Sequence, residues 1–204
     1  MSKCFPDDSH ERAVGGIVAG IDEAGIGPWA GPVVAAAVVF EPGRIPTGIH
    51  DSKLLKASER ERLFNEILAV AHTGIGIASV EEIDRLNILA ASHLAMRRAL
   101  ELLGVSPQLA LIDGKRLPAL PCAARAIIGG DRLCVSIAAA SILAKVTRDR
   151  IMAELASIHP AYGWEKNSGY GTKQHQGALA LHGVTAHHRR SYRPVRAFLV
   201  QAAA

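Results

Sequence analysis

Acidic residues of this sequence stand where short apolar runs end. Runs at residues 17–21 and 109–112 are followed by Asp22, Glu23 and Asp113, and a further predicted strand at residues 124–128 leads through a Gly-Gly turn to Asp131. Short apolar runs bounded by turn residues are typical of buried strands. No cluster of His or Cys accompanies these acids, so the ligand atoms that they offer are all oxygen, which suits Mg²⁺ or Mn²⁺ rather than zinc.

Converging carboxylates repel one another, and this repulsion raises the pKa of at least one of them. Such a cluster is costly unless it serves binding, and a pair of divalent ions relieves the repulsion. Asp22 and Glu23 point to opposite faces if the strand continues through them. We therefore expect the first strand to end at these two residues, with the glycine-rich residues 24–27 supplying the end.

The fourth carboxylate position has two candidates. Asp131 follows a predicted strand and a Gly-Gly turn. Asp149 lies instead within a predicted helix, between Arg148 and Arg150. A carboxylate beside arginines on a helix is typical of an ordinary surface ion pair. We predict that Asp131 completes the set.

The elements that must position these acids alternate between strands and helices. Helical patterns cover residues 80–103, with a possible interruption at Asn87, and residues 136–158. Ser79 and Glu82 form a capping box at the start of the first pattern. This alternation predicts an α/β fold in one domain over residues 1–204, with residues 1–13 disordered.

The composition also suits one domain, with an aliphatic core. Of the 204 residues 49% are hydrophobic and only 4% aromatic, and the net charge of +4 allows a polyanionic partner without demanding one. Cys4, Cys122 and Cys134 lack metal-type spacing and are interpreted as reduced, structural thiols. No apolar run is long enough to span a bilayer and the first residues lack a signal core, so we predict a cytoplasmic monomer with no membrane partner.

The residues around the first acids resemble a known family. The stretch IDEAGIGPWAGPVV at residues 21–34 is similar to the first motif of bacterial ribonuclease HII, DEAGRGP-x-x-GPV. Further similar blocks follow in the family's order, at residues 51–53, 82–84, 87–89, 111–114, 129–131, 138–149, 169–175 and 187–191. The resemblance implies a ribonuclease H-like fold: a mixed five-stranded sheet flanked by helices, with a helical C-terminal extension at about residues 160–204 that binds substrate.

The resemblance implies a function as well. An endoribonuclease of this kind hydrolyses the RNA strand of RNA–DNA hybrids and cuts 5′ to ribonucleotides embedded in DNA, leaving 3′-hydroxyl and 5′-phosphate ends. Two Mg²⁺ or Mn²⁺ ions held by the four acids would activate a water and stabilise the leaving oxygen. Such an enzyme serves DNA replication and repair. Two alternatives stay open, a non-catalytic hybrid-binding protein and another nuclease of the same fold superfamily.

Substrate recognition is implied at two places. Gly25, Ile26 and Gly27 match the family's Gly-Arg-Gly, whose backbone senses the ribose 2′-OH, so a guanidinium is missing at Ile26. Tyr170 matches the tyrosine that stacks on the sugar beside the scissile bond. Ser168 stands where the family commonly has Lys, which is a second missing positive charge.

Contacts to the phosphates are predicted at polar and basic residues, which are Ser52, Lys53, Lys145, Arg148, Arg189 and Arg190. Taken alone, each basic residue suits a solvated surface charge better. Neighbouring histidines rarely chelate one ion, so we interpret His187 and His188 as surface or hydrogen-bonding residues.

Overall fold

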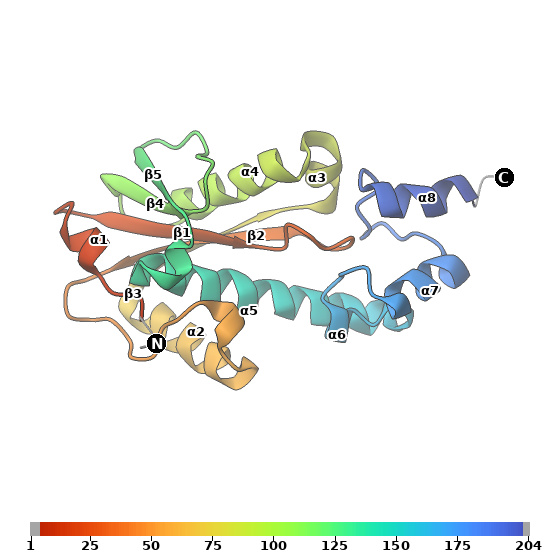
Figure 1. Ribbon diagram of the computed structural model, residues 1–204, viewed down its shortest axis with the longest axis horizontal. Helices are drawn as coiled ribbons and strands as arrows, with labels where there is room; N and C mark the ends of the chain where they lie inside the picture. Colours follow the sequence, from red (N-terminus) through yellow and green to blue (C-terminus); the bar gives the residue numbers. More distant parts are fainter. Residues whose placement is uncertain (1–4, 202–204) are drawn as a thin grey trace.

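A mixed five-stranded sheet forms the centre of the protein in a computed structural model that describes residues 5–201 (Figure 1). The strands are β1 (Val18–Ala24), β2 (Val33–Phe40), β3 (Ala71–Ala78), β4 (Leu109–Asp113) and β5 (Ala123–Ile127). Their order is β3-β2-β1-β4-β5. The first three strands pair antiparallel, while β1–β4 and β4–β5 pair parallel. The predicted mixed five-stranded sheet is confirmed.

Helices cover both faces of this sheet and extend beyond one end of it (Figure 1). The α-helices are α1 (Ser9–Arg12), α2 (Ala57–Val70), α3 (Val80–Leu86), α4 (Ile88–Glu101), α5 (Val135–Ile158), α6 (Trp164–Asn167), α7 (Lys173–His182) and α8 (Arg193–Gln201). Short 3₁₀ helices are η1 (Ser52–Leu54), η2 (Gly130–Arg132) and η3 (Pro160–Tyr162). None of the helices described is long and apolar enough to cross a lipid bilayer.

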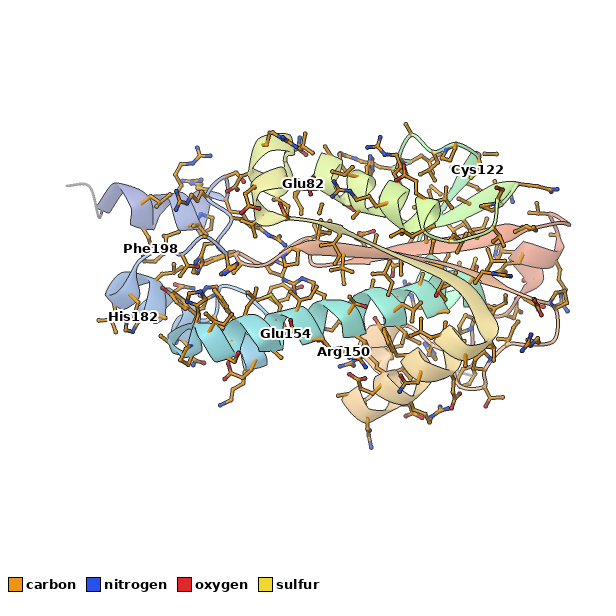
Figure 2. The ribbon with its side chains drawn as sticks, turned by 180° about the vertical axis from the view of Figure 1, so that it is seen from behind. Glu82, Cys122, Arg150, Glu154, His182 and Phe198 are labelled. Atoms are coloured by element: carbon orange, nitrogen blue, oxygen red, sulfur yellow. The ribbon has the colours of Figure 1, made fainter. Side chains whose placement is uncertain are left out.

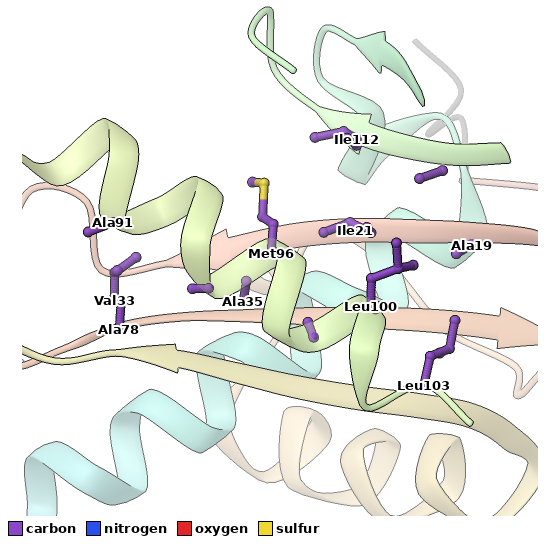
Figure 3. Packing of buried hydrophobic residues seen from close by; sticks show 14 of the residues in the cluster. Ala19, Ile21, Val33, Ala35, Ala78, Ala91, Met96, Leu100, Leu103 and Ile112 are labelled. Atoms are coloured by element: carbon purple, nitrogen blue, oxygen red, sulfur yellow. The ribbon is translucent and has the colours of Figure 1, made fainter. Parts of the chain in front are cut away.

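Small residues let the two main helices approach the sheet closely. Helix α4 packs on one face, where Met96 and Leu100 meet Ile21 and Ala35 of the central strands (Figure 3). The Ala-rich α5 packs on the opposite face. Gly20 of β1 lies directly under the backbone of α5 at residues 136–137, and any side chain there would collide with it. The close contact fixes β1, and with it the acids at the end of β1, against α5.

The junction of α3 and α4 follows the predicted pattern. Ser79 Oγ accepts from the backbone N–H of Glu82 at 3.2 Å, and a Glu82 carboxylate oxygen accepts from the Ser79 N–H at 2.9 Å, which is the capping box. Asn87 ends α3 with a φ of 71° and caps α4 with its own side chain, which accepts from Leu89 and Ala90. Glu82 also pairs with Arg98 at 2.7 Å, and this hydrogen-bonded charge lowers the pKa of Glu82 to about 2.

Our prediction of disorder over residues 1–13 is wrong for residues 5–13; residues 1–4 lie outside the described part. The backbone of Asp7 bridges to that of Cys134, and the Asp7 carbonyl accepts from Val135 at 2.9 Å. A carboxylate oxygen of Glu11 accepts from the backbone N–H of Ser136 at 3.0 Å. Helix α5 has no side-chain cap of its own, so Glu11, 125 residues earlier, satisfies its first turn.

The C-terminal segment begins with η3 and α6, which pack on the far half of α5 rather than on the sheet. Met152 and Ala156 of α5 meet Trp164 and Leu179 of this segment in a separate apolar cluster. Figure 2 shows the labelled His182 and Phe198 at this end of the molecule. The predicted helical C-terminal extension therefore exists as a structural unit, which reaches back to the sheet through the loop that follows β1.

Candidate active site

Three carboxylates meet at one edge of the sheet. Strands β1 and β4 run parallel with Ile21 opposite Ile112, so Asp22 and Asp113 follow at the same edge. The 3₁₀ helix η2 brings Asp131 to them. Asp22, Asp113 and Asp131 each place a carboxylate oxygen within 4.8 Å of the other two. Asp22 and Asp131 are buried, at 4% and 5% exposure.

Strand β1 does not end where we expected. Its pairing with β4 stops at Ile21, but its pairing with β2 continues through Asp22 and Glu23 to Ala24. Because side chains alternate along a strand, Glu23 points away from the face that Asp22 uses. Glu23 is accordingly not one of the three carboxylates that share a 4.8 Å group, although the charge of Asp113 still acts on it.

Burial and mutual repulsion shape the electrostatics of this cluster. The pKa of Asp22 lies well above its usual value because the side chain is buried and because Glu23 and Asp113 carry like charges. Burial, assisted by Asp113, raises the pKa of Glu23 to about 7, and the positive charge of Lys53 opposes this rise. Burial and the charge of Asp51 raise the pKa of Asp131. The folded chain thus concentrates negative charge that a cation would stabilise.

Lys53 supplies one nearby positive charge. Its Nζ lies 3.5 Å from Asp131 Oδ2 and 3.9 Å from Asp51 Oδ1, while most of the side chain stays exposed. Ser52 beside it is buried, and its backbone N–H donates to Ser141 Oγ at 3.3 Å. The buried acid Asp51 was missed by our sequence reasoning. The signal was present, because an Asp two residues before a Lys can cap a turn, and Asp51 Oδ1 does accept from Lys53 N–H at 3.0 Å.

Asp149 lies outside the carboxylate group. One of its oxygens accepts a charged hydrogen bond from Lys145 at 2.7 Å, one helical turn away in α5. The same oxygen lies 3.5 Å from Ser168 Oγ. The geometry therefore places Asp131 with Asp22 and Asp113, and Asp149 in an ion pair within its own helix.

Two of the arginines predicted as phosphate contacts are wrong in that role, because main-chain carbonyls occupy their donors. Arg148 is 2% exposed and Arg189 is fully buried. The guanidinium of Arg148 donates at 3.0 Å to each of three carbonyls, those of Ala30, Pro32 and Ser168. The guanidinium of Arg189 donates to the carbonyls of Gly25, Ile26, Gly31 and Pro32. Both side chains hold the loop between β1 and β2 in place.

The buried arginines place two positive charges beneath that loop. Both donate to the same carbonyl, that of Pro32, at 3.0 and 3.1 Å. Burial and the neighbouring charge of Arg189 lower the pKa of Arg148 to about 10, so it stays protonated at neutral pH. Among the residues that the structure describes, no carboxylate lies within ion-pair distance of either guanidinium. The loop therefore presents a surface that favours an anion.

Several of the other predicted substrate contacts lie in this loop or close to it. Gly25 takes a φ of 105°, and a side chain there would collide with Arg148. Tyr170 is half exposed, and its ring lies beside Gly27, where an added Cβ would meet it at 3.3 Å. Ile26 is partly exposed. Arg190 keeps an exposed side chain while its backbone N–H donates to Asp84 at 2.9 Å.

Two buried histidines support Tyr170, and our sequence reasoning identified neither as a support. His175 Nδ1 lies 3.0 Å from the Tyr170 carbonyl, an acceptor, so Nδ1 carries the proton and His175 Nε2 accepts from Trp164. His188 Nδ1 accepts from the Thr185 N–H, which leaves the proton on His188 Nε2, 2.9 Å from His175 Nε2. His188 is thus hydrogen-bonding, one of the two roles we predicted, and it is not on the surface. Burial lowers its pKa to about 3.

The carboxylate group suits a hard divalent cation. Its donors are all carboxylate oxygens, and no His or Cys joins them within residues 5–201. Comparison with known proteins adds a second line of evidence. The model of the family described as Ribonuclease HII matches residues 19–195, which is most of the chain. The chain belongs to the ribonuclease HII family.

Relatives and a solved structure agree with this assignment. The chain is 58% identical to Ribonuclease HII of Cereibacter sphaeroides over 208 residues, which covers all of this chain and 98% of the relative. It is 59% identical to Ribonuclease HII of Ruegeria pomeroyi, over 90% of this chain and 79% of the relative. The crystal structure of ribonuclease H2 from Pyrococcus horikoshii matches with a TM-score of 0.75 at 27% identity, covering 91% of this chain and 98% of that one.

Membership in the ribonuclease HII family makes this protein a nuclease: a hydrolase of the ribonuclease H type, with a nucleic acid as its substrate. The three converging carboxylates form a group able to hold a metal ion. The ribonuclease H-like fold predicted from the sequence is confirmed by the sheet order and by the structural match.

Proposed function

We propose that this ribonuclease HII cuts 5′ to ribonucleotides embedded in DNA and hydrolyses the RNA strand of RNA–DNA hybrids, leaving 3′-hydroxyl and 5′-phosphate ends. The observation that carries the proposal is the convergence of Asp22, Asp113 and Asp131 at the edge of the sheet, beside a loop that favours an anion. A phosphodiester and a cluster of acids repel each other, so the acids serve this substrate only with cations between them.

Asp22, Asp113 and Asp131 would hold Mg²⁺ or Mn²⁺, with Glu23 at the margin of the group. Two such ions, when bound, supply Lewis-acid stabilisation of the phosphate and an activated water. The chain's own residues set the geometry. The backbone N–H of Gly130 donates to Asp113 Oδ1 at 2.7 Å, and the N–H of Glu23 donates to Asp22 Oδ1 at 2.7 Å, so both carboxylates are oriented before any ligand arrives.

Substrate recognition falls to the loop after β1 and to Tyr170. The backbone of Gly25, Ile26 and Gly27 would meet the ribose 2′-OH, and the half-exposed ring of Tyr170 beside Gly27 would stack on the neighbouring sugar. Contacts to the phosphates fall to the accessible cations, which are Lys53, Lys145 and Arg190. Ser52 remains a candidate through its hydroxyl. Arg148 and Arg189 act from beneath, by holding the loop.

The test is cleavage of a duplex that carries one ribonucleotide, beside an RNA–DNA hybrid and an all-DNA duplex of the same sequence, with Mg²⁺ and with Mn²⁺. We expect cuts 5′ to the ribonucleotide and none in all-DNA. Binding of the hybrid without cleavage under either metal would favour the hybrid-binding alternative. Cleavage of all-DNA junctions or ends would instead favour another nuclease of this fold.

A paired substitution separates Asp131 from Asp149. Asp131→Asn removes an oxygen donor from the carboxylate group, so we expect kcat to fall by roughly 10²-fold or more. Asp149→Asn removes only the ion pair with Lys145, which is worth about 0.5 kcal/mol in a helix, and we expect activity within a few fold of the parent. Steady-state cleavage of the single-ribonucleotide duplex measures both. The reverse ranking would mean that Asp149 is the ligand.

Restoring a charge at Ile26 tests the contribution of the missing guanidinium. Ile26 is 39% exposed, so Ile26→Arg can extend into solvent and we expect tighter substrate binding with a steeper salt dependence. One charge-assisted hydrogen bond is worth about 1.5–3 kcal/mol at most. Ile26→Gln is the uncharged control of similar length. Equal affinities for the two variants across a salt series would rule out a contact with phosphate.

We also propose that the protein acts as a monomer and in the cytoplasm, in DNA replication and repair. Its proposed substrate, DNA with embedded ribonucleotides, is a product of replication inside the cell. The two cysteines described, Cys122 and Cys134, are free thiols, which agrees with a reducing compartment.

A further inference from the structure

The C-terminal extension holds the loop after β1 through hydrogen bonds to two consecutive carbonyls. Arg189 Nη2 donates to the Gly25 carbonyl at 2.6 Å, and Arg189 Nη1 donates to the Ile26 carbonyl at 3.0 Å. Tyr192 Oη donates to the same Ile26 carbonyl at 2.6 Å and accepts from Arg189 Nη1 at 2.9 Å. Arg189, Tyr192 and the Ile26 carbonyl thus form a closed hydrogen-bonded ring.

These hydrogen bonds determine where two N–H groups of the loop point. In a trans peptide the C=O of one residue and the N–H of the next point in opposite directions. With the carbonyls of Gly25 and Ile26 held toward Arg189, the N–H groups of Ile26 and Gly27 point away from the extension. Among the residues that the structure describes, neither N–H has a backbone or side-chain acceptor. Two adjacent free donors beside the ring of Tyr170 suit the oxygen of a ribose hydroxyl.

We propose that Tyr192 is a positioning residue for ribose recognition, which acts through the Ile26 carbonyl to aim the N–H groups of Ile26 and Gly27 at the 2′-OH. The proposal rests on the proposed function, and it extends the specificity site from the loop to the C-terminal extension. Ile26 has no polar side chain that could order this loop. The loop is ordered instead by the hydrogen bonds that its carbonyls accept from Arg189 and Tyr192.

Tyr192 and Arg189 differ in how much else depends on them. Arg189 is fully buried and also holds the carbonyls of Gly31 and Pro32, so removing it disturbs the whole loop. Among the described residues the Tyr192 hydroxyl bonds only to Arg189 and to the Ile26 carbonyl, and its side chain is half-buried. Tyr192→Phe therefore removes one oxygen and keeps the aromatic packing, including the guanidinium of Arg189 over its ring at 5.2 Å.

The chain offers a matched control. Tyr162 also donates its hydroxyl to a main-chain carbonyl of the extension, that of Gly183 at 2.9 Å, and among the described residues this hydroxyl makes no hydrogen bond to the loop after β1. Tyr162→Phe and Tyr192→Phe thus each remove a tyrosine hydroxyl that donates to a main-chain carbonyl oxygen. A merely structural role predicts the same outcome for both: a lower melting temperature and unchanged substrate preference.

The experiment measures the affinities of the parent and both variants for a single-ribonucleotide duplex and an all-DNA duplex by fluorescence anisotropy, with cleavage kinetics alongside. We expect Tyr192→Phe to lower the preference for the ribonucleotide roughly 3- to 10-fold, the value of one hydrogen bond, mostly through KM. Tyr162→Phe should keep the parent's preference. Parent-like preference and KM in Tyr192→Phe would overturn the positioning role. If the parent does not cleave, the proposed function is overturned instead. The binding preferences of the parent and Tyr192→Phe then still test the positioning role of Tyr192.

Discussion

Asp22→Asn and Asp113→Asn should each abolish turnover, lowering kcat by at least about 10³-fold, while the fold and hybrid binding persist. Each substitution removes a carboxylate from a group whose oxygens lie within 4.8 Å of one another. Asn keeps the size and one oxygen of Asp but offers no charge to a divalent cation. In the proposed function, substrate binding depends on the loop after β1 and on accessible cations, so we expect it to change little.

The matched control is Glu154→Gln, which removes a carboxylate from the exposed side of α5 (Figure 2). We expect this variant to cleave like the parent. Titration with Mn²⁺, followed by the rise in melting temperature, gives a second readout: the rise should shrink in Asp22→Asn and Asp113→Asn but not in Glu154→Gln. Retained cleavage in Asp113→Asn, with normal kcat, would remove Asp113 from the catalytic group.

The sequence predicts well those features that the pairing of adjacent strands determines. Apolar runs ending in acids predicted that Asp22 and Asp113 would converge, and the parallel pairing of β1 with β4 produces that proximity. The cap at Ser79 and the break at Asn87 were readable because both depend on residues within four positions. Local rules therefore located the elements and the main acids.

The features that the sequence could not show depend on partners far along the chain. Arg148 and Arg189 lie among polar residues and match basic blocks of the family, so a phosphate contact was the natural interpretation. Most of their partners are carbonyls of the loop after β1, more than 110 residues away. A carbonyl carries no signature in a sequence, because every residue has one. Glu11 likewise has a distant main-chain partner, the first turn of α5.

Glu23 shows a different reason why the sequence misleads. Adjacent acids were expected to share one site by ending the strand, whereas antiparallel pairing with β2 carries the strand one residue past Glu23. Strand length is set by the partner strand, and no local signal in Asp22-Glu23-Ala24 specifies it. The result is an acid beside the group rather than within it, with a raised pKa that has consequences for stability.

The metal-free protein should lose stability at the carboxylate cluster as the pH rises from about 4.5 to about 7. Glu23 titrates near its ordinary value of 4.5 when unfolded and at about 7 when folded, so the folded state binds more protons across this window. Stability from this group is therefore fully present below pH 4.5 and is lost as the pH passes 7. The loss for Glu23 is on the order of 3 kcal/mol, and the raised pKa of Asp22 adds to it.

The buried histidines have the opposite effect on stability over part of this pH range, because their contribution grows as the pH rises. His188 has an unfolded pKa near 6.5 and a folded pKa of about 3, so its contribution is lost as the pH falls below 6.5. The measured quantity is consequently a difference: the free energy of unfolding of the parent minus that of Glu23→Gln, from denaturant titrations between pH 4 and pH 8. We expect this difference to become more negative by a few kcal/mol across the window.

Two further measurements make the explanation specific to the cluster. Glu82→Gln removes an acid whose pKa is already lowered to about 2 by Arg98, so it should destabilise the protein by a constant amount between pH 4.5 and pH 8. Added Mg²⁺ or Mn²⁺ should stabilise the parent strongly at pH 8 and hardly at pH 5, because protons compete with the metal for the same oxygens. A pH-independent difference between parent and Glu23→Gln would show that Glu23 titrates normally, and would separate it from the charge cluster of Asp22 and Asp113.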